Sequence, residues 1–458
     1  MSAGSRRSLA RLGGAVRRYL PWELGDPLLR GYFTSRGVLL MVTVALLTLV
    51  VWAAQGSSSL NNALTFLAKV NAFLAISLLS LTFVMSTRLS VLEDLFGGLD
   101  RQYQAHTVIG KITLFAVLLH VAFLAIGAAP AWGVVLTYVV PGLDVPVTWG
   151  ILSLAALFAL LALTVQFRPP YGLWKQTHRL MIVPLLLALW HALVAGSDTQ
   201  AFPALRYWLV AIGAVGVIAF LYSFALYRYI GPRHPGTVAG VRRFPDLTEI
   251  VVRPQRPVRF HPGQFMFLRF PRCPGVPEMW PFSISGWTAD GDLRFSIKKL
   301  GDFTARGAPR IEEGDEVVLM GPYGKFGERY AAEGRDMVWV AGGAGITPFL
   351  SMARHEAERA GDRRVDLIWT YRRPSEGVYN DELSALESER FRYLPWVSSE
   401  RGHIDAKWIA EAVGGADELA RRTIMMCGPV PMMRDLTEQF VALGVRRRDI
   451  VFEDFDLL

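Results

Sequence analysis

Long apolar runs separated by short polar connections fill the first half of the chain. Six of these runs are each close to the ~20 residues with which an α-helix crosses a hydrocarbon core of ~30 Å. They lie at residues 37–54, 64–85, 106–127, 147–166, 178–195 and 205–227. From Arg228 onward, short strand-like and helix-like segments alternate as they do in a soluble α/β protein. The pattern predicts a six-helix transmembrane bundle followed by soluble domains.

Two of the predicted spans carry a pair of histidines each. His106 and His120 belong to the third span, and His178 and His191 to the fifth. Ionisable side chains are costly at membrane depth, so such residues indicate a functional site. A rise of ~1.5 Å per residue separates the members of each pair by roughly 20 Å along the helix. One metal cannot reach both members. Because the two spans run in the same direction, the pairs predict two metal centres, one near each membrane face.

The helical phase differs between the two pairs. At ~100° per residue, His106 and His120 lie within about 40° of the same helix face. His178 and His191 would lie about 140° apart on an ideal straight helix. Pro184 lies between them, and proline removes a backbone hydrogen bond and kinks a helix. We therefore expect a distortion near Pro184 that brings the two rings to one side.

Paired imidazoles on neighbouring helices suit an iron porphyrin. Zinc needs four ligands, or three and a water molecule. Haem supplies four iron ligands itself, so two histidines complete the site. Gly110, Ala116, Ala188 and Ala192 are small enough to leave room for a macrocycle. The structural alternative is a set of histidines hydrogen-bonded within a helical core. We predict two bis-histidine haems.

The soluble half begins with short strand-like segments. Residues 248–253 alternate as a strand, and residues 261–268 are typical of a turn followed by a strand. Further strands are expected at 280–285 and 293–298, and the segments 314–319 and 321–324 are expected to close the structure, with glycine and proline between them. Several short strands punctuated in this way predict a small barrel.

The last part of the chain alternates strands with helices. A buried strand at 337–341 precedes the turn Gly342-Gly343-Ala344-Gly345-Ile346-Thr347-Pro348, and a helix-like stretch at 349–360 follows. Glycines permit close backbone approach and a helix N-terminus attracts anions, so the turn is a candidate phosphate cradle. A plain strand-to-helix connection is the alternative. Strands at 365–371 and 423–426 favour a doubly wound α/β domain.

Lysine and arginine are distributed unevenly among the connections. They are concentrated in residues 1–36 and after the second, fourth and sixth spans, whereas 55–62 and 128–146 contain none. The positive-inside rule therefore places both termini and the soluble half in the cytoplasm. The same connections contribute heavily to the net charge of +8, which needs no nucleic-acid partner. Cys273 and Cys427 both lie on the reducing side, so we expect no structural disulfide.

Six short motifs of the soluble half occur in the order of a known family. They are His-Pro-Gly-Gln-Phe at 261–265, Pro-Phe-Ser-Ile-Ser at 281–285, Gly-Asp-Phe-Thr at 301–304, Gly-Pro-Tyr-Gly at 321–324, Gly-Gly-Ala-Gly-Ile-Thr-Pro at 342–348 and Cys-Gly-Pro at 427–429. This order resembles ferredoxin–NADP reductase-like dehydrogenase modules. With the six spans and the histidine pairs, the whole chain resembles the NADPH oxidase and ferric reductase superfamily.

The resemblance implies ligands and cofactors for each part of the chain. It implies haem ligation by His106 with His178 and by His120 with His191. It also implies FAD in the barrel and a nicotinamide cofactor in the last domain. The expected domains are a basic cytoplasmic arm (1–36), a transmembrane haem domain (37–229), an FAD-binding barrel (235–333) and an NADPH-binding domain (334–458).

Flavin contacts follow from the same resemblance, residue by residue. Pro281, Phe282 and Ser283 are similar to the family's contacts with the isoalloxazine and ribityl groups. Gly301 and Thr304 are similar to part of its flavin pyrophosphate site.

The chain departs from the family at Trp280, where relatives have histidine or arginine. The change removes an obvious cation for the flavin phosphates, and Lys298, Lys299 or Arg306 could substitute for it. The indole ring could instead stack on the flavin or the adenine. We therefore expect FAD to be lost readily during purification.

Nicotinamide-cofactor contacts are implied in two turns. Residues of the glycine turn would hold the dinucleotide pyrophosphate, namely Gly342, Gly343, Gly345, Thr347 and Pro348. Cys427, Gly428 and Pro429 resemble the family's motif beside the nicotinamide. Phe455 in the C-terminal tail is the candidate aromatic ring that covers the flavin and is displaced when nicotinamide docks.

The residues after the second strand of the last domain bear on the choice of cofactor. Arg372 and Arg373 lie where the 2′-phosphate of NADPH would arrive, and Arg401 is a further candidate. No acidic residue ends that strand to bind a free 2′-hydroxyl, so we predict a preference for NADPH over NADH.

These parts predict an electron route from NADPH through FAD and the two haems to the outer face. Dioxygen, giving superoxide, is the preferred acceptor. Lys69, about two turns below the outer surface, is a candidate for attracting superoxide, with a snorkelling lysine as the alternative. A ferric chelate, or a partner supplied with electrons, would be the other endpoint. No regulatory motif or appended domain is evident, so we expect constitutive activity; the sequence neither requires nor excludes a partner subunit.

Overall fold

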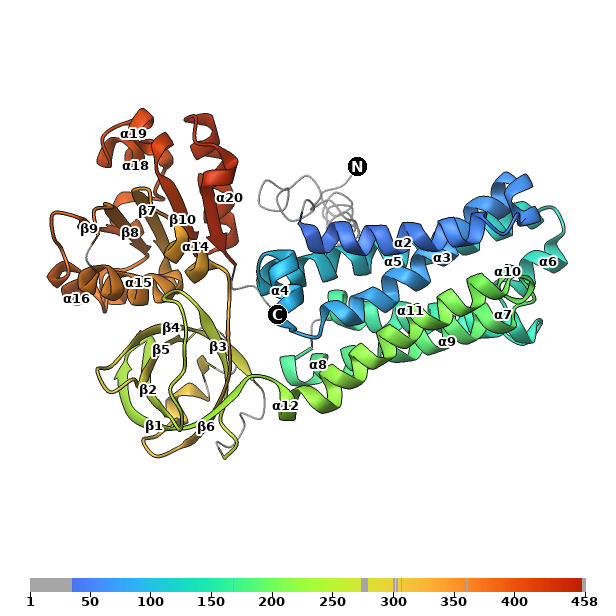
Figure 1. The fold of residues 1–458 in the computed structure, drawn as a ribbon, viewed down its shortest axis with the longest axis horizontal. Coiled ribbons are helices and arrows are strands. Elements are labelled where there is room, and N and C mark those ends of the chain that lie inside the picture. The colour runs from blue at the N-terminus through green and yellow to red at the C-terminus, as the bar shows by residue number, and fades with distance from the viewer. Residues whose placement is uncertain are drawn as a thin grey trace, which may run out of the picture. The chain divides into compact units, whose positions relative to one another are not determined.

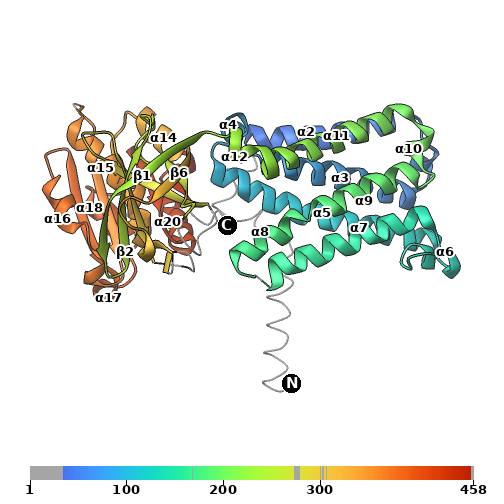
Figure 2. The same ribbon diagram turned by 90° about the horizontal axis from the view of Figure 1, so that it is seen from below.

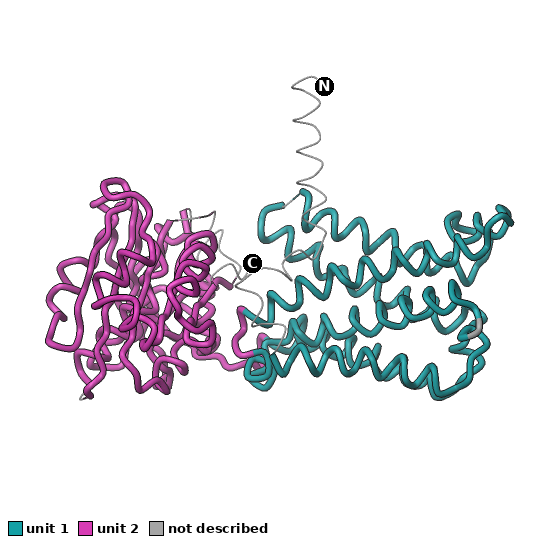
Figure 3. Tube along the Cα trace, turned by 90° about the horizontal axis from the view of Figure 1, so that it is seen from above, with its two compact units in different colours: residues 1–96, 101–227 teal, residues 97–100, 228–458 magenta. Residues whose placement is uncertain are grey.

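The computed structural model describes residues 35–167, 169–272, 279–299, 301, 304–305, 307–359 and 361–454. The predicted N-terminal arm up to residue 34 lies outside this part, as do Cys273, Arg306 and Phe455. The chain divides into two compact units (Figure 3). The first ends at Tyr227, and the second comprises residues 228–458 together with the short segment 97–100.

In the described part of the first unit, six helical segments are long and apolar enough to cross a membrane. They are α2 (Arg36–Ala53), α3 (Ala63–Met85), α5 (Leu99–Ala128), α7 (Val145–Ala162) with the π-turn η3 (Leu163–Phe167), α8 (Tyr171–Arg179) with α9 (Ile182–Val194), and α11 (Pro203–Leu221) with η4 (Tyr222–Leu226) and α12 (Tyr227–Ile230). The predicted multi-pass bundle is confirmed.

Short helices mark the two ends of the bundle. η2 (Ser58–Asn61), α6 (Trp132–Thr137) and α10 (Asp198–Ala201) belong to the connections at one end, and α4 (Ser90–Phe96) and α8 lie at the other (Figure 1, Figure 2). Side chains fix three of the span starts. The N-cap oxygens of Ser35, Asn62 and Asp144 accept from the backbone N–H three residues later, at 3.3, 3.0 and 2.9 Å, which satisfies donors that a helix start leaves unpaired.

Helix α3 is the central element of the bundle. It buries 61% of its most apolar stretch, whereas each of the other five spans buries a third or less. Large aliphatic side chains such as Leu39, Leu46, Val50 and Ile218 remain exposed on the outer helices. An apolar surface of this kind is suited to lipid rather than to water.

The second unit begins with a closed antiparallel barrel in the strand order β1-β2-β5-β4-β3-β6. The strands are β1 (Arg233–Phe244), β2 (Leu247–Pro254), β3 (Phe265–Arg269), β4 (Trp280–Trp287), β5 (Leu293–Lys298) and β6 (Glu316–Tyr323), and η5 (Ala308–Arg310) precedes β6. Alternate side chains, including Ile250, Met266, Ile284 and Phe295, are fully buried inside it. The barrel predicted from the spacing of glycine and proline is confirmed.

A five-stranded parallel sheet in the order β11-β10-β7-β8-β9 follows. Its strands are β7 (Met337–Gly342), β8 (Val365–Tyr371), β9 (Phe391–Val397), β10 (Thr423–Cys427) and β11 (Ile450–Glu453). The connecting helices are α14 (Phe326–Ala332), α15 (Ile346–Glu358), α16 (Asn380–Ala385), α17 (Ser398–Arg401), α18 (Ala406–Ala412), α19 (Ala416–Arg421) and α20 (Val430–Ala442), with the 3-10 turns η6 (Gly343–Gly345), η7 (Pro374–Glu376) and η8 (Arg447–Asp449). The predicted doubly wound domain is confirmed.

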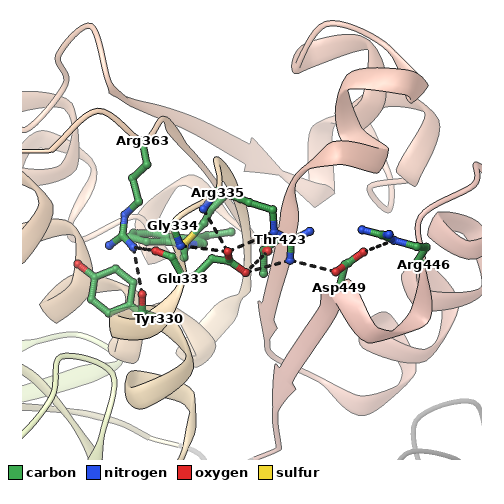
Figure 4. A network of polar contacts seen from close by, with 10 residues as sticks. Tyr330, Glu333, Gly334, Arg335, Arg363, Thr423, Arg446 and Asp449 are labelled. Atoms are coloured by element: carbon green, nitrogen blue, oxygen red, sulfur yellow. Dashed lines mark hydrogen bonds and ion pairs between the residues drawn. The ribbon is translucent and has the colours of Figure 1, made fainter.

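An ion-pair network ties together the N-terminal ends of four of these strands (Figure 4). Arg335, just before β7, contacts Glu333 and Asp449, each at 3.0 Å, and Thr423 at the start of β10 donates to Glu333. Arg363, just before β8, donates to the Glu333 carbonyl at 2.7 Å. Burial opposes the charge of Glu333, but hydrogen bonds from Arg335 and Thr423 outweigh it and lower the carboxyl pKa to about 2. The network lies at the sheet edge opposite the glycine turn, so its role is structural.

Candidate functional site

The histidines of the third and fifth spans face one another in pairs. His106 on α5 and His178 on α8 have ring centres 6.0 Å apart and planes inclined by 62°. A metal–imidazole bond is about 2 Å long, so two imidazoles on opposite sides of one metal have centres about 6 Å apart. His120 and His191 are within electrostatic reach of each other. The pairs coincide with those implied by the family resemblance, and ligation of a metal stays a prediction.

Helix α3 orients both histidines of α5. His106 Nδ1 lies 3.0 Å from the Thr82 carbonyl oxygen, and His120 Nδ1 lies 2.9 Å from the Ala68 carbonyl oxygen. The two carbonyl residues have the same fourteen-residue spacing as the two histidines, because α3 and α5 run in opposite directions. A carbonyl oxygen only accepts, so each Nδ1 carries the proton. Each Nε2 therefore keeps a lone pair for a metal.

The histidines of the fifth span are oriented from α7 and its π-turn η3. His191 Nδ1 lies 2.9 Å from the Pro146 carbonyl oxygen, and His178 Nδ1 lies 3.4 Å from Thr164 Oγ1. The Thr164 hydroxyl donates to the Leu160 carbonyl at 2.9 Å, so its oxygen is free to accept from His178. All four imidazoles thus have the protonation that a metal ligand needs.

The fifth span is interrupted where a distortion was expected. Helix α8 ends at Arg179 and α9 begins at Ile182, two residues before Pro184, which lies in its first turn. Pro184 has no N–H for the Leu180 carbonyl, which instead accepts from Val183 at 2.9 Å. The break resets the helical phase between the two histidines, and Pro184 is its cause.

Open space and small residues surround the rings. A Cβ on Gly150 would lie 3.1 Å from three atoms of the His191 ring, so α7 packs against that ring through a glycine. A Cβ on Gly110, one turn after His106, would meet nothing within 4 Å beyond its own helix. Within the described ranges, no group of three or more His, Cys, Asp or Glu residues could hold a metal ion. Two oriented imidazoles beside open space fit an iron whose other four ligands come from a porphyrin.

Lys69 reaches the outer histidine pair from α3. Its ammonium group interacts electrostatically with His120, His191 and Asp198. The side chain is half-buried. Its predicted part in attracting an anion stays a prediction.

Strand β4 presents the residues similar to flavin contacts. The rings of Trp280 and Phe282 pack against the barrel core, and Pro281 lies half-buried between them. Ser283 is buried, and its Oγ has no hydrogen-bond partner among the described residues. A buried hydroxyl without a partner costs ~1–3 kcal/mol. A bound group that accepts from or donates to Ser283 would remove that cost, so the strand fits a flavin contact.

The predicted pyrophosphate turn is stabilised by its own threonine. The backbone N–H of Gly301 donates to Thr304 Oγ1 at 2.8 Å, and the Thr304 hydroxyl is 3.1 Å from the Gly301 carbonyl. Residues 302–303 lie outside the described part, as does Arg306. Lys299, one of the cations considered for the flavin phosphates, donates to the carbonyl of Pro245 at 2.6 Å.

The glycine turn and the Cys-Gly-Pro turn touch at a switch point of the sheet. β7 and β10 are neighbours, but the chain proceeds from β7 toward β8 and from β10 toward β11, on opposite sides. Ligands of open α/β sheets bind at such a point. A Cβ on Gly345 would overlap the Cys427 carbonyl, and a Cβ on Gly428 would lie 2.9 Å from the Gly342 Cα. Only glycine allows the two turns to approach so closely.

The remaining residues of these two turns begin helices. Thr347 and Pro348 are buried in the first turn of α15, and the Thr347 hydroxyl donates to the Ala344 carbonyl at 3.1 Å. Gly343 has a φ of +52°, a left-handed conformation that favours glycine. Pro429 precedes α20 with a φ of −57°. Both helix N-termini therefore start at the same edge of the sheet.

A pocket opens between the glycine turn and the barrel. Its lining comprises Asp246, Leu247, Lys298, Gly343, Ala344, Ile346, Thr347, Trp369, Tyr371, Ser375, Glu376, Val378 and Tyr379. The Trp369 indole donates to the Gly343 carbonyl at 3.0 Å, and Lys298 pairs with Glu376 at 2.7 Å. Aromatic rings beside a phosphate cradle suit a dinucleotide. Lys298 thus belongs to this pocket as well as to the end of β5.

Glu376 is a pocket residue that the sequence interpretation missed. It lies five residues beyond the last residue of β8, so no acidic residue ends the strand itself. Burial disfavours its charge, but Lys298 and then Arg373 overcome this effect and lower its pKa. Arg373 lies 3.4 Å from Glu376, and Arg372 is exposed. The guanidinium of Arg401 lies 5.4 Å from the centre of the Trp396 ring.

Cys427 is fully buried at the end of β10. Burial raises its thiol pKa, and the negative charges of Glu453 and Asp454 raise it further, so the group stays a thiol. Glu453 ends the neighbouring strand β11, and its Oε1 lies 3.0 Å from the place of a Cβ on Gly324. A buried carboxylate at the C-terminal edge of a parallel sheet was not predicted as a site residue. The position of Phe455 lies outside the described residues.

Three protein families match successive parts of the chain. Ferric reductase like transmembrane component matches residues 71–189, a range that contains His106, His120 and His178 and ends two residues before His191. An FAD-binding domain matches residues 245–326, which include β4 and the Gly301 turn. An oxidoreductase NAD-binding domain matches residues 339–438, which include both turns of the switch point.

Individual relatives match a shorter stretch. The reductase component of propane 2-monooxygenase from Rhodococcus jostii is 30% identical over 229 residues, which are 46% of this chain and 60% of that protein. The ferredoxin reductase component of 3-ketosteroid-9-alpha-monooxygenase from Mycobacterium tuberculosis is 28% identical over 221 residues, 47% of this chain and 60% of that protein. The chain thus spans about three fifths of the length of these curated relatives.

A solved structure is similar over a comparable share. The ferredoxin reductase in carbazole 1,9a-dioxygenase covers 49% of this chain and 69% of its own, with 24% identity and a TM-score of 0.42. The family matches carry the assignment. A ferric reductase-like transmembrane part, an FAD-binding barrel and an NAD-binding domain follow one another along one chain, which is the domain architecture of the NADPH oxidase and ferric reductase superfamily.

Proposed function

We propose that this chain transfers electrons across a membrane, from cytoplasmic NADPH through FAD and two bis-histidine haems to dioxygen at the outer face. One NADPH supplies two electrons, so each turnover gives NADP⁺, a proton and two superoxide ions. When bound, the flavin accepts a hydride and releases single electrons, which haem iron carries one at a time.

The observation that carries the proposal is the arrangement of the four histidines. Two imidazole pairs lie at two levels of one bundle, and each Nδ1 is committed to an oxygen acceptor. Each pair offers two Nε2 atoms for one metal, and roughly 20 Å of helix separates the levels. Since two histidines and a porphyrin fill the coordination of one iron, an outer acceptor would react beside the outer pair rather than on the metal.

At the cytoplasmic end, the switch point of the sheet is the proposed NADPH site. The glycine turn would receive the pyrophosphate, and Arg372 and Arg373 would meet the 2′-phosphate. Glu376 could instead accept from a ribose hydroxyl, which would favour NADH. Its pairing with Lys298 and Arg373 compensates that charge, so we keep NADPH as the preferred donor. Cys427, as a buried thiol, would contact the nicotinamide ring without reacting with it.

At the other end, Lys69 is the proposed contact for the acceptor. Its ammonium group interacts with both outer histidines and would attract a superoxide anion as it forms. The proposed location of the bundle is the plasma membrane. The distribution of lysine and arginine supports an orientation in which both termini and the second unit lie in the cytoplasm.

A second candidate function is electron supply to a partner. The relatives from Rhodococcus jostii and Mycobacterium tuberculosis are named as reductase components of monooxygenases, which favours a protein that hands its electrons to another one. Ferric-chelate reduction is the third alternative. Both would use the same route as far as the outer pair.

The test is NADPH consumption by the detergent-purified protein, loaded with haem and FAD, in air and under argon. Fast oxygen-dependent consumption with dismutase-sensitive reduction of cytochrome c is the expected result. Haems that become reduced under argon but reoxidise slowly in air would exclude dioxygen and favour a ferric chelate or a partner. Failure of NADPH to reduce the haems at all would refute the electron route itself.

A further inference from the structure

Asp198, in the connection between the fifth and sixth spans, is held by the end of the first span and the connection that follows it. Its carboxylate accepts from the Trp52 indole at 2.6 Å, from the Ser57 hydroxyl at 2.9 Å and from the Ser59 hydroxyl at 3.4 Å. Trp52 is almost fully buried at the end of α2, and Ser57 and Ser59 follow it in the first outer connection. Three donors from one segment fix the position of this negative charge.

Trp52, which donates to Asp198, packs its ring against Phe66 and Phe73, and Lys69 lies between these two residues in the sequence of α3. Lys69 interacts electrostatically with Asp198, and the same ammonium group interacts with His120 and His191. A second carboxylate, Asp144 at the start of α7, interacts with His191. Lys69 is thus the cation that couples Asp198 to the outer pair, and removing the Asp198 carboxylate would leave its positive charge without this compensation.

We propose that Asp198 sets the acceptor selectivity of the outer site by compensating the charge of Lys69. The inference rests on the proposed electron route to the outer face. Asp198 adds a negative charge beside the outer site, so it disfavours an anionic ferric chelate and leaves a neutral molecule such as dioxygen unaffected. Asp198 is a positioning residue, because it acts on the acceptor through Lys69 and through the local potential.

The size of the effect follows from Coulomb's law. One unit charge acting over several ångströms at a protein surface changes the local concentration of a charged acceptor about fivefold. The change has opposite signs for anionic and cationic acceptors, is absent for dioxygen, and shrinks as salt is added. A general loss of packing would show none of these dependences on acceptor charge.

The experiment uses the full chain, loaded with haem and FAD, in vesicles of zwitterionic phosphatidylcholine. NADPH is added outside, so only copies with the second unit outward react, and the acceptor is trapped in the lumen. Ferricyanide serves as the anionic acceptor and hexaammineruthenium(III) as the cationic one. The trapped acceptors meet the bundle end that carries the outer connections and cannot take electrons directly from the flavin.

Asp198→Asn keeps oxygen acceptors for Trp52 and Ser57 but removes the charge. We expect the KM for ferricyanide to fall and the KM for hexaammineruthenium to rise, each by about fivefold or more because both ions are trivalent, so that their ratio changes about 25-fold or more, with kcat within twofold. Lys69→Met should shift the ratio the other way, and the double variant should return it toward the wild-type value. Optical redox titration should also show one haem of Asp198→Asn with a higher midpoint potential, a readout that does not depend on turnover.

Ser57→Ala is the matched control, because it removes one donor to Asp198 without changing any charge. If the wild-type protein reduces both acceptors at a normal rate but Asp198→Asn leaves the ratio of their KM values unchanged, this inference is overturned and the proposed route is not. An equal shift in Ser57→Ala also overturns it, since packing would then explain the effect. A wild-type protein that reduces neither trapped acceptor nor dioxygen overturns the proposed route together with this inference.

Discussion

At the scale of single residues, Gly345 has no space for a side chain. A Cβ there would overlap the Cys427 carbonyl oxygen and lie 2.8 Å from the Gly428 nitrogen. We expect Gly345→Ala to push the two turns of the switch point apart, at a cost of roughly 1–3 kcal/mol in stability. The KM for NADPH should rise at least tenfold. Gly240→Ala, where a Cβ meets nothing within 4 Å, should leave KM and the melting temperature unchanged. Equal KM values in the two variants would contradict the predicted pyrophosphate site.

In the transmembrane bundle, Gly150 likewise has little space for a side chain. A Cβ there would come within 3.1 Å of the His191 ring, a distance at which the ring must move. We expect Gly150→Ala to lower the haem content from two per chain toward one, as measured by the pyridine haemochrome assay. Gly133→Ala, with no atom within 4 Å of its Cβ, is the control and should keep both haems. Full haem retention by Gly150→Ala would show that His191 tolerates displacement or does not bind haem.

From the sequence, candidate site residues such as the paired histidines could be identified, but the groups to which they form hydrogen bonds in the fold could not. The histidines were visible because charge is rare at membrane depth. The carbonyls of Thr82 and Ala68 that orient them carry no sequence signal, since every residue has a carbonyl. Glu376 pairs with Lys298 across 78 residues of chain, and a contact of that range depends on the fold. A carboxylate soon after a predicted strand is the signal that could have found Glu376.

At the scale of elements, the apolar runs predicted all six spans, but two of the helices begin earlier than the runs do. Helices α5 and α8 begin at Leu99 and Tyr171, seven residues before the predicted starts. Hydropathy reports contact with lipid, whereas a backbone helix continues through polar residues such as Arg101 and Gln104. The break after α8 was expected only as a kink at Pro184. The strands expected at 248–253, 293–298 and 365–371 match β2, β5 and β8 to within one residue at each end, whereas β1, β9 and β11 were not predicted.

The ion-pair network before β7 predicts how the stability of the second unit changes in acid. Glu333 has its pKa lowered from 4.5 to about 2 in the folded protein. A lowered folded pKa stabilises the fold fully above the ordinary value and loses this contribution as pH falls through about 2. We expect the melting temperature of the second unit to fall steeply between pH 4.5 and 2. Glu333→Gln should be less stable at pH 7 by roughly 1–3 kcal/mol and should lose less stability in acid. Parallel pH profiles would contradict this assignment.

At the scale of the whole molecule, the remaining expectation is the direction in which the chain crosses the membrane. An even number of spans puts residues 35 and 454 on the same side, opposite the connections 55–62 and 128–146. The absence of lysine and arginine from those connections predicts that they face outward. If the orientation were reversed, NADPH in the cytoplasm would be on the wrong side of the bundle.

Cysteine labelling in intact cells tests the orientation. In a Cys273→Ser background the remaining Cys427 is fully buried, so single cysteines can be placed at exposed positions. Leu143→Cys, at a side chain 57% exposed in the 128–146 connection, should react with a membrane-impermeant maleimide. Lys407→Cys, on the exposed side of α18, should react only after lysis. The opposite pattern would invert the topology and require an extracytoplasmic electron donor. Because the two variants share the same background and reagent, a difference between them reports the side of the membrane alone.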